Sequence, residues 1–381
     1  MTKKELIKKN VPVTFVATAV MLLAAPMLAQ PRFEYRPGLL SFQQQMLRVS
    51  WQLKRPGYTQ EIAQSYAPAV LDFTFGRNSH LLISSAAGWS NAALASNYEM
   101  SGVTDTRLRF SQRLADRWML GVGLNLPTGD NRLDFNQNVV ANLLTESILS
   151  FPLQRLGVGT DLEFSLAHAL NLSGTLGLGL GGTLIVPGKF EFRRDQNAAY
   201  KPGARYVLTA MFNYIGTPIK WQLNLMGQIY GRDQIEGKNF FKQGMQFEPS
   251  FAGEWRFARQ WEGGVSLRHI WKDDNEIAMG TGNAIPPEHF YINNTTFAVL
   301  HLNRYWGRRA QTGVLLGWNR FAESNQQLNR ATISRLGLNM AVKISGHLIL
   351  HAGGDYAAGQ AENGAIDLHG YSTAFTLSTR F

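Results

Sequence analysis

The stretch HGYSTAFTLSTRF, residues 369–381, decides the fold class that this sequence predicts. One parity carries Tyr371, Thr373, Phe375, Leu377, Thr379 and Phe381, and the other carries Ser372, Thr376, Ser378 and Arg380. Strict alternation is typical of a strand whose two faces meet different surroundings. An aromatic last residue also suits a barrel strand that finishes at a membrane interface. We therefore interpret Tyr371, Phe375, Leu377 and Phe381 as an insertion signal, with the barrel-assembly machinery of the outer membrane as its partner.

The N-terminal sequence has the pattern of a secretory signal. Four lysines precede an uncharged stretch, residues 11–28, and Ala29 offers a small residue for cleavage. We expect residues 1–29 to be a cleaved signal peptide. A single spanning helix is the alternative, since about 18 apolar residues approach the length that crosses a bilayer. Residues 30–381 would then form the barrel, with residues 30–45 as a periplasmic N-terminal segment or a plug.

The composition narrows the class of protein. The 381 residues include 37 Gly, 22 Phe, 12 Tyr and 9 Trp, and their mean hydropathy is −0.16. A bundle of membrane helices needs about 20 apolar residues for each span, whereas a barrel needs an apolar residue only at every second position. The absence of cysteine excludes disulfides and thiol-based sites.

The net charge of +10 and the pI near 9.8 would ordinarily suggest nucleic-acid binding. Export argues against that partner, and the basic residues are scattered along the chain. We expect no nucleic acid as a partner, and instead contact with outer-membrane lipid, lipopolysaccharide and anionic solutes. Arg193, Arg194 and Lys201 are candidates for lipopolysaccharide contact, with simple solvation as the alternative.

Alternating segments recur along the chain, separated by breaks of alternating length. Residues 219–230 and 118–126 give the clearest examples, at the length of about 9–11 residues that a tilted barrel strand needs. Short breaks are predicted near residues 113–118, 169–173, 215–219, 257–261, 305–309 and 345–347. Long breaks are predicted near residues 127–157, 187–204, 231–244, 272–293, 321–331 and 358–369. Short periplasmic turns and long external loops are typical of outer-membrane barrels.

The predicted fold is therefore all-β, a transmembrane antiparallel up-and-down β-barrel of about 14–16 strands. Eleven strands follow residue 158, and residues 104–114 and 118–126 add two. Residues 47–53, 71–75 and 80–87 complete sixteen, and the number falls to fourteen if residues 47–53 and a neighbouring strand belong to a plug. The chain is placed in the bacterial outer membrane.

The two strand faces differ in chemistry. Aromatic residues predicted to face lipid are Trp118, Phe164, Tyr214, Trp221, Phe247, Phe251, Trp255, Trp271 and Trp318. The opposite parity carries the lumen-facing candidates Arg107, Arg109, Glu163, Glu248, Glu254, Arg256, Arg268, Arg335 and Lys343. An arginine or lysine facing lipid at mid-depth would cost about 2–4 kcal/mol. We therefore expect a polar lumen.

No constellation of catalytic or metal-binding residues emerges from the sequence. The eight histidines are dispersed, and none forms a metal-binding pair or a hydrolase triad with its neighbours. We expect no enzyme, no cofactor and no metal, and an outer-membrane hydrolase is the less favoured alternative. Residues 131–156 depart from the barrel pattern, because Val139, Val140, Leu143, Leu144, Ile148 and Leu149 have helical spacing. This segment is predicted to pack on the barrel mouth or to fold inward as a constriction.

The motifs Ser101-Gly102-Val103-Thr104-Asp105 and Leu126-Pro127-Thr128-Gly129 resemble those of a bacterial group. They are similar to the strand start and strand end of the transporter-like outer-membrane barrels named after phenol-degradation pathways, although Val103-Thr104 departs from that pattern. The resemblance covers about thirty residues and implies an outer-membrane channel for small, hydrophobic or aromatic compounds. Together with the polar lumen, it predicts passive transport of a small molecule, with a non-conducting structural or surface-interaction barrel as the alternative.

Overall fold

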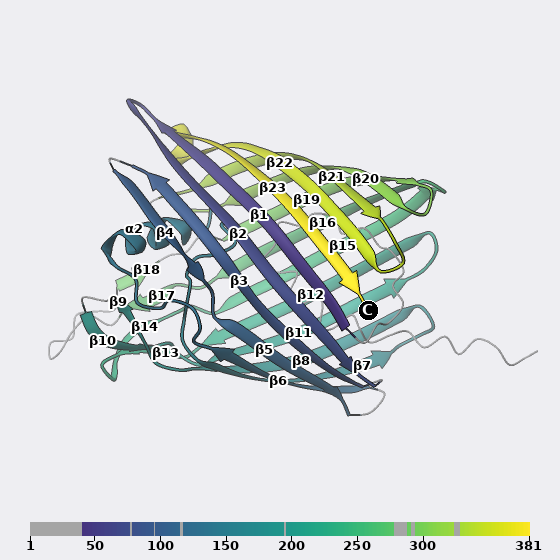
Figure 1. The fold of residues 1–381 in the computed structure, drawn as a ribbon, viewed down its shortest axis with the longest axis horizontal. Helices are drawn as coiled ribbons and strands as arrows, with labels where there is room; N and C mark the ends of the chain where they lie inside the picture. Colours follow the sequence, from purple (N-terminus) through teal and green to yellow (C-terminus); the bar gives the residue numbers. More distant parts are fainter. Residues whose placement is uncertain are drawn as a thin grey trace, which may run out of the picture.

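The computed structural model describes residues 40–76, 78–94, 96–114, 117–193, 196–277, 288–290, 294–323 and 328–381. The signal peptide predicted for residues 1–29 lies outside these residues, as do residues 30–39. Within them the chain forms a closed antiparallel barrel (Figure 1). Its N-terminal strands are β1 (Leu40–Arg55), β2 (Tyr58–Phe75), β3 (Ser79–Ala93), β4 (Asn97–Val103), β5 (Thr106–Arg113), β6 (Trp118–Leu126), β7 (Asp161–Asn171) and β8 (Leu176–Pro187). Its later strands are β11 (Arg205–Ile215), β12 (Ile219–Tyr230), β15 (Gln246–Ala258), β16 (Trp261–Lys272), β19 (Thr295–Trp306), β20 (Ala310–Phe321), β21 (Ala331–Lys343), β22 (Leu348–Ala361) and β23 (Ile366–Arg380).

The barrel has sixteen wall positions, which confirms the upper end of the predicted range. Strands β4 and β5 both pair with β3, so together they form one interrupted strand. The last strand closes the sheet on the first, with Ser41 opposite Arg380 and Lys54 opposite Asp367. A closed sheet leaves no row of unpaired backbone groups, which is the condition for spanning a bilayer with strands.

The connections differ between the two ends of the barrel (Figure 1). Short turns lie at the end that carries the C-terminus, and the long loops gather at the opposite end. The segments predicted as long loops at residues 187–204, 231–244 and 272–293 contain further strands, which is a correction. These are β9 (Phe190–Arg193), β10 (Gln196–Lys201), β13 (Arg232–Ile235), β14 (Lys238–Lys242), β17 (Asn275–Ile277) and β18 (Glu288–Phe290). They form a second, six-stranded sheet at the long-loop end.

The outward parity of the wall carries an apolar belt. Exposed large side chains of this belt include Trp118, Phe164, Tyr206, Leu208, Phe251, Trp255, Leu300, Leu316, Trp318, Leu336, Leu338 and Phe375. So large an exposed apolar surface would be a liability in water. It matches the lipid-facing band of an outer-membrane barrel.

Near the long-loop end the apolar side chains change parity within single strands. In β23, Tyr371 and Phe375 are exposed on the outward face, whereas Ile366 and Leu368 are buried on the inward face. The exposed Asp367 is outward at this level. The strand has left the membrane here, so water meets its outer face and protein fills its inner side. The long loop predicted at residues 358–369 is accordingly wrong, because only residues 362–365 separate β22 from β23.

Candidate functional site

The predicted amphipathic segment folds against the inner side of the wall. Helix α2 (Phe135–Leu144) begins with a capping box, in which Asp134 Oδ1 accepts from the Gln137 backbone N–H at 2.9 Å. Val140, Ala141 and Leu144 are its buried side. The helix ends before Ile148 and Leu149, which are buried in irregular backbone that continues the same apolar surface. We name residues 131–156 the inward segment. Among the described residues, no helix has the length and apolar character needed to cross a membrane.

The inward segment and the outer part of the wall share one apolar core. Buried members from the segment are Leu133, Val140, Ala141, Leu144, Ile148, Leu149, Phe151, Leu153 and Leu156. Members from the wall include Trp51, Leu53, Ile62, Met100, Phe321, Ile333, Ile366 and Leu368. A wholly polar interior is therefore the wrong expectation for this end of the barrel. This core was not predicted from the sequence. Its wall residues lie on the same parity that carries polar side chains nearer the short-turn end of the strands.

Two buried side chains of the wall bind the backbone of the inward segment. The Trp51 indole N–H donates to the Leu149 carbonyl at 2.8 Å. Gln64, only 1% exposed, donates to the Leu153 carbonyl at 2.7 Å and accepts from the Leu153 N–H at 3.0 Å. A Cβ at Gly88 would lie 2.3 Å from Leu153 Cδ2, so the absent side chain makes room for this leucine. These contacts define a single position of the inward segment against the wall.

Asp105 links the residues that flank the inward segment on its two sides. Its carboxylate accepts from the Gly129 N–H at 2.9 Å, from the Val158 N–H at 2.8 Å and from Asn125 Nδ2 at 2.9 Å. Its own N–H donates to the Leu156 carbonyl at 3.1 Å. Asp105 and Gly129 are residues of the two quoted sequence motifs. Asp105 lies in the interruption between β4 and β5, and Gly129 contacts it there.

The inward segment also contacts the second sheet. Arg132 forms an ion pair with Glu191 of β9 at 2.9 Å, and the Arg155 guanidinium lies 5.7 Å from the centre of the Phe190 ring. Burial lowers the pKa of the Arg155 guanidinium. Burial, and then the hydrogen bond that its hydroxyl donates to Asp233, raise the pKa of Tyr200. The second sheet therefore contacts the inward segment through β9.

Below the inward segment, most of the predicted lumen-facing candidates occur as cross-strand ion pairs. The pairs are Arg109–Glu163 at 3.3 Å, Arg256–Glu262 at 3.6 Å, Arg268–Glu248 at 2.6 Å and Arg335–Asp355 at 3.2 Å. Each lies on the parity opposite to the exposed apolar belt. Glu248 is only 2% exposed, and its Oε2 accepts a hydrogen bond from Arg268 Nη2 at 2.8 Å. Such a charge-assisted hydrogen bond stabilises a buried carboxylate.

A glycine makes the first of these pairs possible. Gly123 of β6 stands in register between Arg109 of β5 and Glu163 of β7. A Cβ at this position would lie 2.9 Å from the Glu163 Cβ. With no side chain in between, Arg109 reaches across a whole strand to its partner. Alternation along the sequence predicts the inward parity of both residues but not this pairing.

The remaining candidates differ in surroundings. Arg107 is exposed, and Lys343 is half-buried with no ion-pair partner among the residues that the structure describes. Glu254 lies opposite Lys220 in the register of β15 and β12. Of the insertion-signal residues, Tyr371, Phe375 and Phe381 are exposed and Leu377 is half-buried, all on the outward parity.

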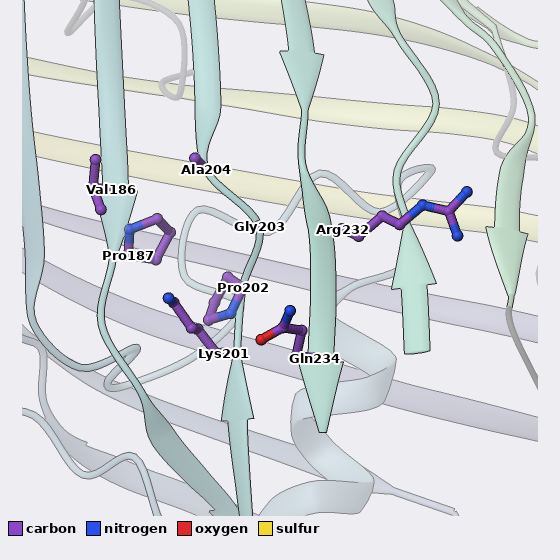
Figure 2. A pocket seen from close by; sticks show the side chains of 8 residues that line it. All are labelled: Val186, Pro187, Lys201, Pro202, Gly203, Ala204, Arg232 and Gln234. Carbon is purple, nitrogen blue, oxygen red and sulfur yellow. The ribbon is translucent and has the colours of Figure 1, made fainter. Parts of the chain in front are cut away.

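Small cavities lie at the long-loop rim. One of about 140 Å³ is lined by Val186, Pro187, Lys201, Pro202, Gly203, Ala204, Arg232 and Gln234 (Figure 2). Arg232 extends away from Lys201 in this view and pairs with Glu276 at 3.0 Å. Lys201 has no ion-pair partner in the described part of the chain. The side chain of Arg193 and all of Arg194, the other candidates for lipopolysaccharide contact, lie outside the described residues.

No group of His, Asp and Glu side chains in the described residues has the geometry of a metal site. His351 and Asp355 share the inner face of β22, but Asp355 accepts from Arg335 and from the Ser372 hydroxyl instead.

Comparisons with known proteins find similar solved structures but no match in sequence. No protein-family model matches the chain, and no curated protein matches it in sequence. Among solved structures, it is similar to the TodX monoaromatic hydrocarbon channel deltaS2 mutant, at 7% identity and a TM-score of 0.48, covering 91% of each chain. The CymD monoaromatic hydrocarbon channel shares 12% identity at a TM-score of 0.45, over 91% of this chain and 89% of that one. The COG4313 outer membrane channel from Pseudomonas putida F1 shares 13% identity at a TM-score of 0.42, over 92% and 99%. All three neighbours are channels by name, and the likeness is one of fold alone.

Proposed function

We propose that this protein is an outer-membrane channel for the passive movement of a small molecule. The observation that carries the proposal is the seating of the inward segment against the inner wall by Trp51 and Gln64. A segment fixed at one specified place inside a barrel sets the width of any path beside it. The solute would pass this constriction and then the face that carries the four ion pairs.

The paired charges would act as the selectivity element. Arg109, Glu163, Glu248 and Arg268 present both signs of charge, so they would favour a polar or zwitterionic solute over a purely apolar one. This choice differs from the hydrophobic compounds that the phenol-degradation resemblance implies. Membership of that family is also part of the proposal, and its support is the meeting of Asp105 and Gly129 at the base of the inward segment.

A non-conducting barrel is the second candidate function. The observation that favours it is the apolar core between the inward segment and the wall, whose buried members are all 7% exposed or less. In that case the barrel would serve a structural or surface-interaction role. Two further proposals are compatible with either candidate function. The barrel-assembly machinery would recognise the C-terminal strand, and Lys201 would contact lipopolysaccharide.

Swelling of proteoliposomes separates the two candidates. Purified protein is reconstituted with an impermeant osmolyte inside, and uncharged, anionic and cationic solutes of graded size are added outside. A channel predicts swelling that falls steeply with solute size and depends on solute charge. Swelling equal to that of protein-free vesicles for every solute would overturn the proposal in favour of the non-conducting barrel.

A further inference from the structure

The lipid-facing side of the barrel carries an arginine at an unusual place. Arg304 lies on the outward parity of β19, between the exposed Leu302 and Trp306. It stands two residues before the end of the strand, at the short-turn end. An arginine facing lipid costs about 2–4 kcal/mol at the midplane and about 0–1 kcal/mol near the interface. Its position thus fits the level of the lipid headgroups.

Two tryptophans hold the Arg304 guanidinium in place. Its central carbon lies 3.8 Å from the centre of the Trp306 ring and 5.4 Å from that of Trp261. Trp261 is the direct cross-strand neighbour of Arg304. The Trp306 ring is itself oriented by a 2.9 Å hydrogen bond from its N–H to the Thr312 hydroxyl. Stacking on ring faces leaves the N–H donors at the guanidinium edge free for a ligand.

The Arg304 side chain forms no hydrogen bond or ion pair among the described residues. Its Nε is buried as well as unpaired, so a ligand could reach only the terminal N–H groups. The adjoining turns add the exposed Arg259, Arg308 and Arg309, and none of these has an ion-pair partner in the described part of the chain. Strand β19 has no carboxylate, and those of β15 and β16 are Glu248, Glu254 and Glu262. All three occupy the inner parity; Glu248 is bound by Arg268, and Glu262 by Arg256 and by the Tyr305 hydroxyl.

We propose that this surface, formed by Arg304 with Arg259, Arg308 and Arg309 around Trp261 and Trp306, binds the phosphate headgroup of an anionic phospholipid. The short-turn end of an outer-membrane barrel is periplasmic, so the lipid would come from the periplasmic leaflet. A phosphodiester accepts two parallel N–H bonds from a guanidinium, and the remaining arginines supply attraction for its negative charge. The acyl chains would lie along the apolar belt below Leu302. A solute in the lumen cannot reach this site, since it is on the outer face.

Native mass spectrometry of the detergent-solubilised barrel tests the site, with phosphatidylglycerol and phosphatidylcholine of matched chains as probes. The wild type is expected to retain phosphatidylglycerol in preference to phosphatidylcholine. Arg304→Gln should weaken phosphatidylglycerol retention about tenfold, because it removes charge-assisted hydrogen bonds to the phosphate. Arg304→Lys should recover only part of it, because lysine keeps the charge but not the planar fork. Free glycerol phosphate should compete weakly, since it lacks the acyl chains.

Arg320→Gln is the matched control. Arg320 is exposed on the outward parity of β20, at the long-loop end of the same wall, so its loss should leave phosphatidylglycerol retention unchanged. The heat-modifiable shift on gels verifies that each variant is folded. Equal retention of both lipids by the wild type would overturn the proposal. So would Arg304→Gln binding phosphatidylglycerol as the wild type does, or Arg320→Gln losing as much as Arg304→Gln.

Discussion

Replacing Gln64 by alanine should loosen the inward segment from the wall. The wild-type side chain is buried and supplies both a donor and an acceptor to the Leu153 backbone, at 2.7 and 3.0 Å. A third hydrogen bond, 3.0 Å to the Ser90 hydroxyl, fixes the amide. Without Gln64, the Leu153 N–H and C=O lose their partners in a dry place, at about 1–3 kcal/mol each. Water can bind these two backbone groups only when the inward segment moves away from the wall.

Even a loss of about 2 kcal/mol shifts the equilibrium between the seated and displaced states by roughly 30-fold. In single-channel recordings of Gln64→Ala, we expect more frequent or longer openings to a higher conductance. Trypsin added from the long-loop side should also cleave faster after Arg155, which is half-buried in the wild type. Gln52→Ala is the control, because Gln52 donates to Glu61 Oε1 on the exposed outer face of β1 and β2. Channel opening and trypsin cleavage of Gln64→Ala equal to those of the wild type would show that the hydrogen bonds to Leu153 do not hold the segment. Equal changes in opening and cleavage in Gln52→Ala would show the same.

Three further changes test other parts of the account. Asp105→Asn should weaken the tie at the base of the inward segment, seen as increased current noise and faster hydrogen exchange at the Gly129 and Val158 amides; unchanged exchange there would contradict the role given to Asp105. Arg109→Gln should shift ion selectivity towards cations and Glu163→Gln towards anions, measured as opposite changes in reversal potential under a salt gradient; shifts of the same sign would exclude the pair from the conducting path. Aspartate in place of both Phe375 and Leu377 should abolish insertion, seen as loss of the heat-modifiable gel shift, whereas a normal shift would remove these residues from the insertion signal.

The wall of the barrel could be predicted from sequence because it rests on a local signal. Alternation with a period of two identifies a strand and its faces without knowledge of any distant residue. The eleven strands after residue 158 follow this signal through residues such as Trp221 and Leu336. The first strands were predicted too short, at residues 47–53 and 71–75. Where β1 leaves the membrane, Trp51 and Leu53 are buried on the inner face, so the apolar parity reverses and the pattern appears to stop.

The candidate site depends on contacts that alternation does not encode. The helical spacing of Val140 and Leu144 predicted an amphipathic segment that packs on the barrel mouth or folds inward. Its seat could not be predicted, because Gln64 and Leu153 are 89 residues apart and neither belongs to a motif. The second sheet was missed for a related reason. Its strands are only three to six residues long, too short for periodicity to emerge from loop sequence.

Single-channel recording of the wild type beside a variant lacking residues 131–156 tests the central claim most directly. Both proteins are inserted from the same side into planar bilayers of one lipid composition. We predict a small, charge-selective conductance for the wild type and a several-fold larger, less selective one for the deletion variant. A folded barrel that conducts in neither form would contradict the channel account, and equal conductance in both would show that the inward segment does not constrict the path.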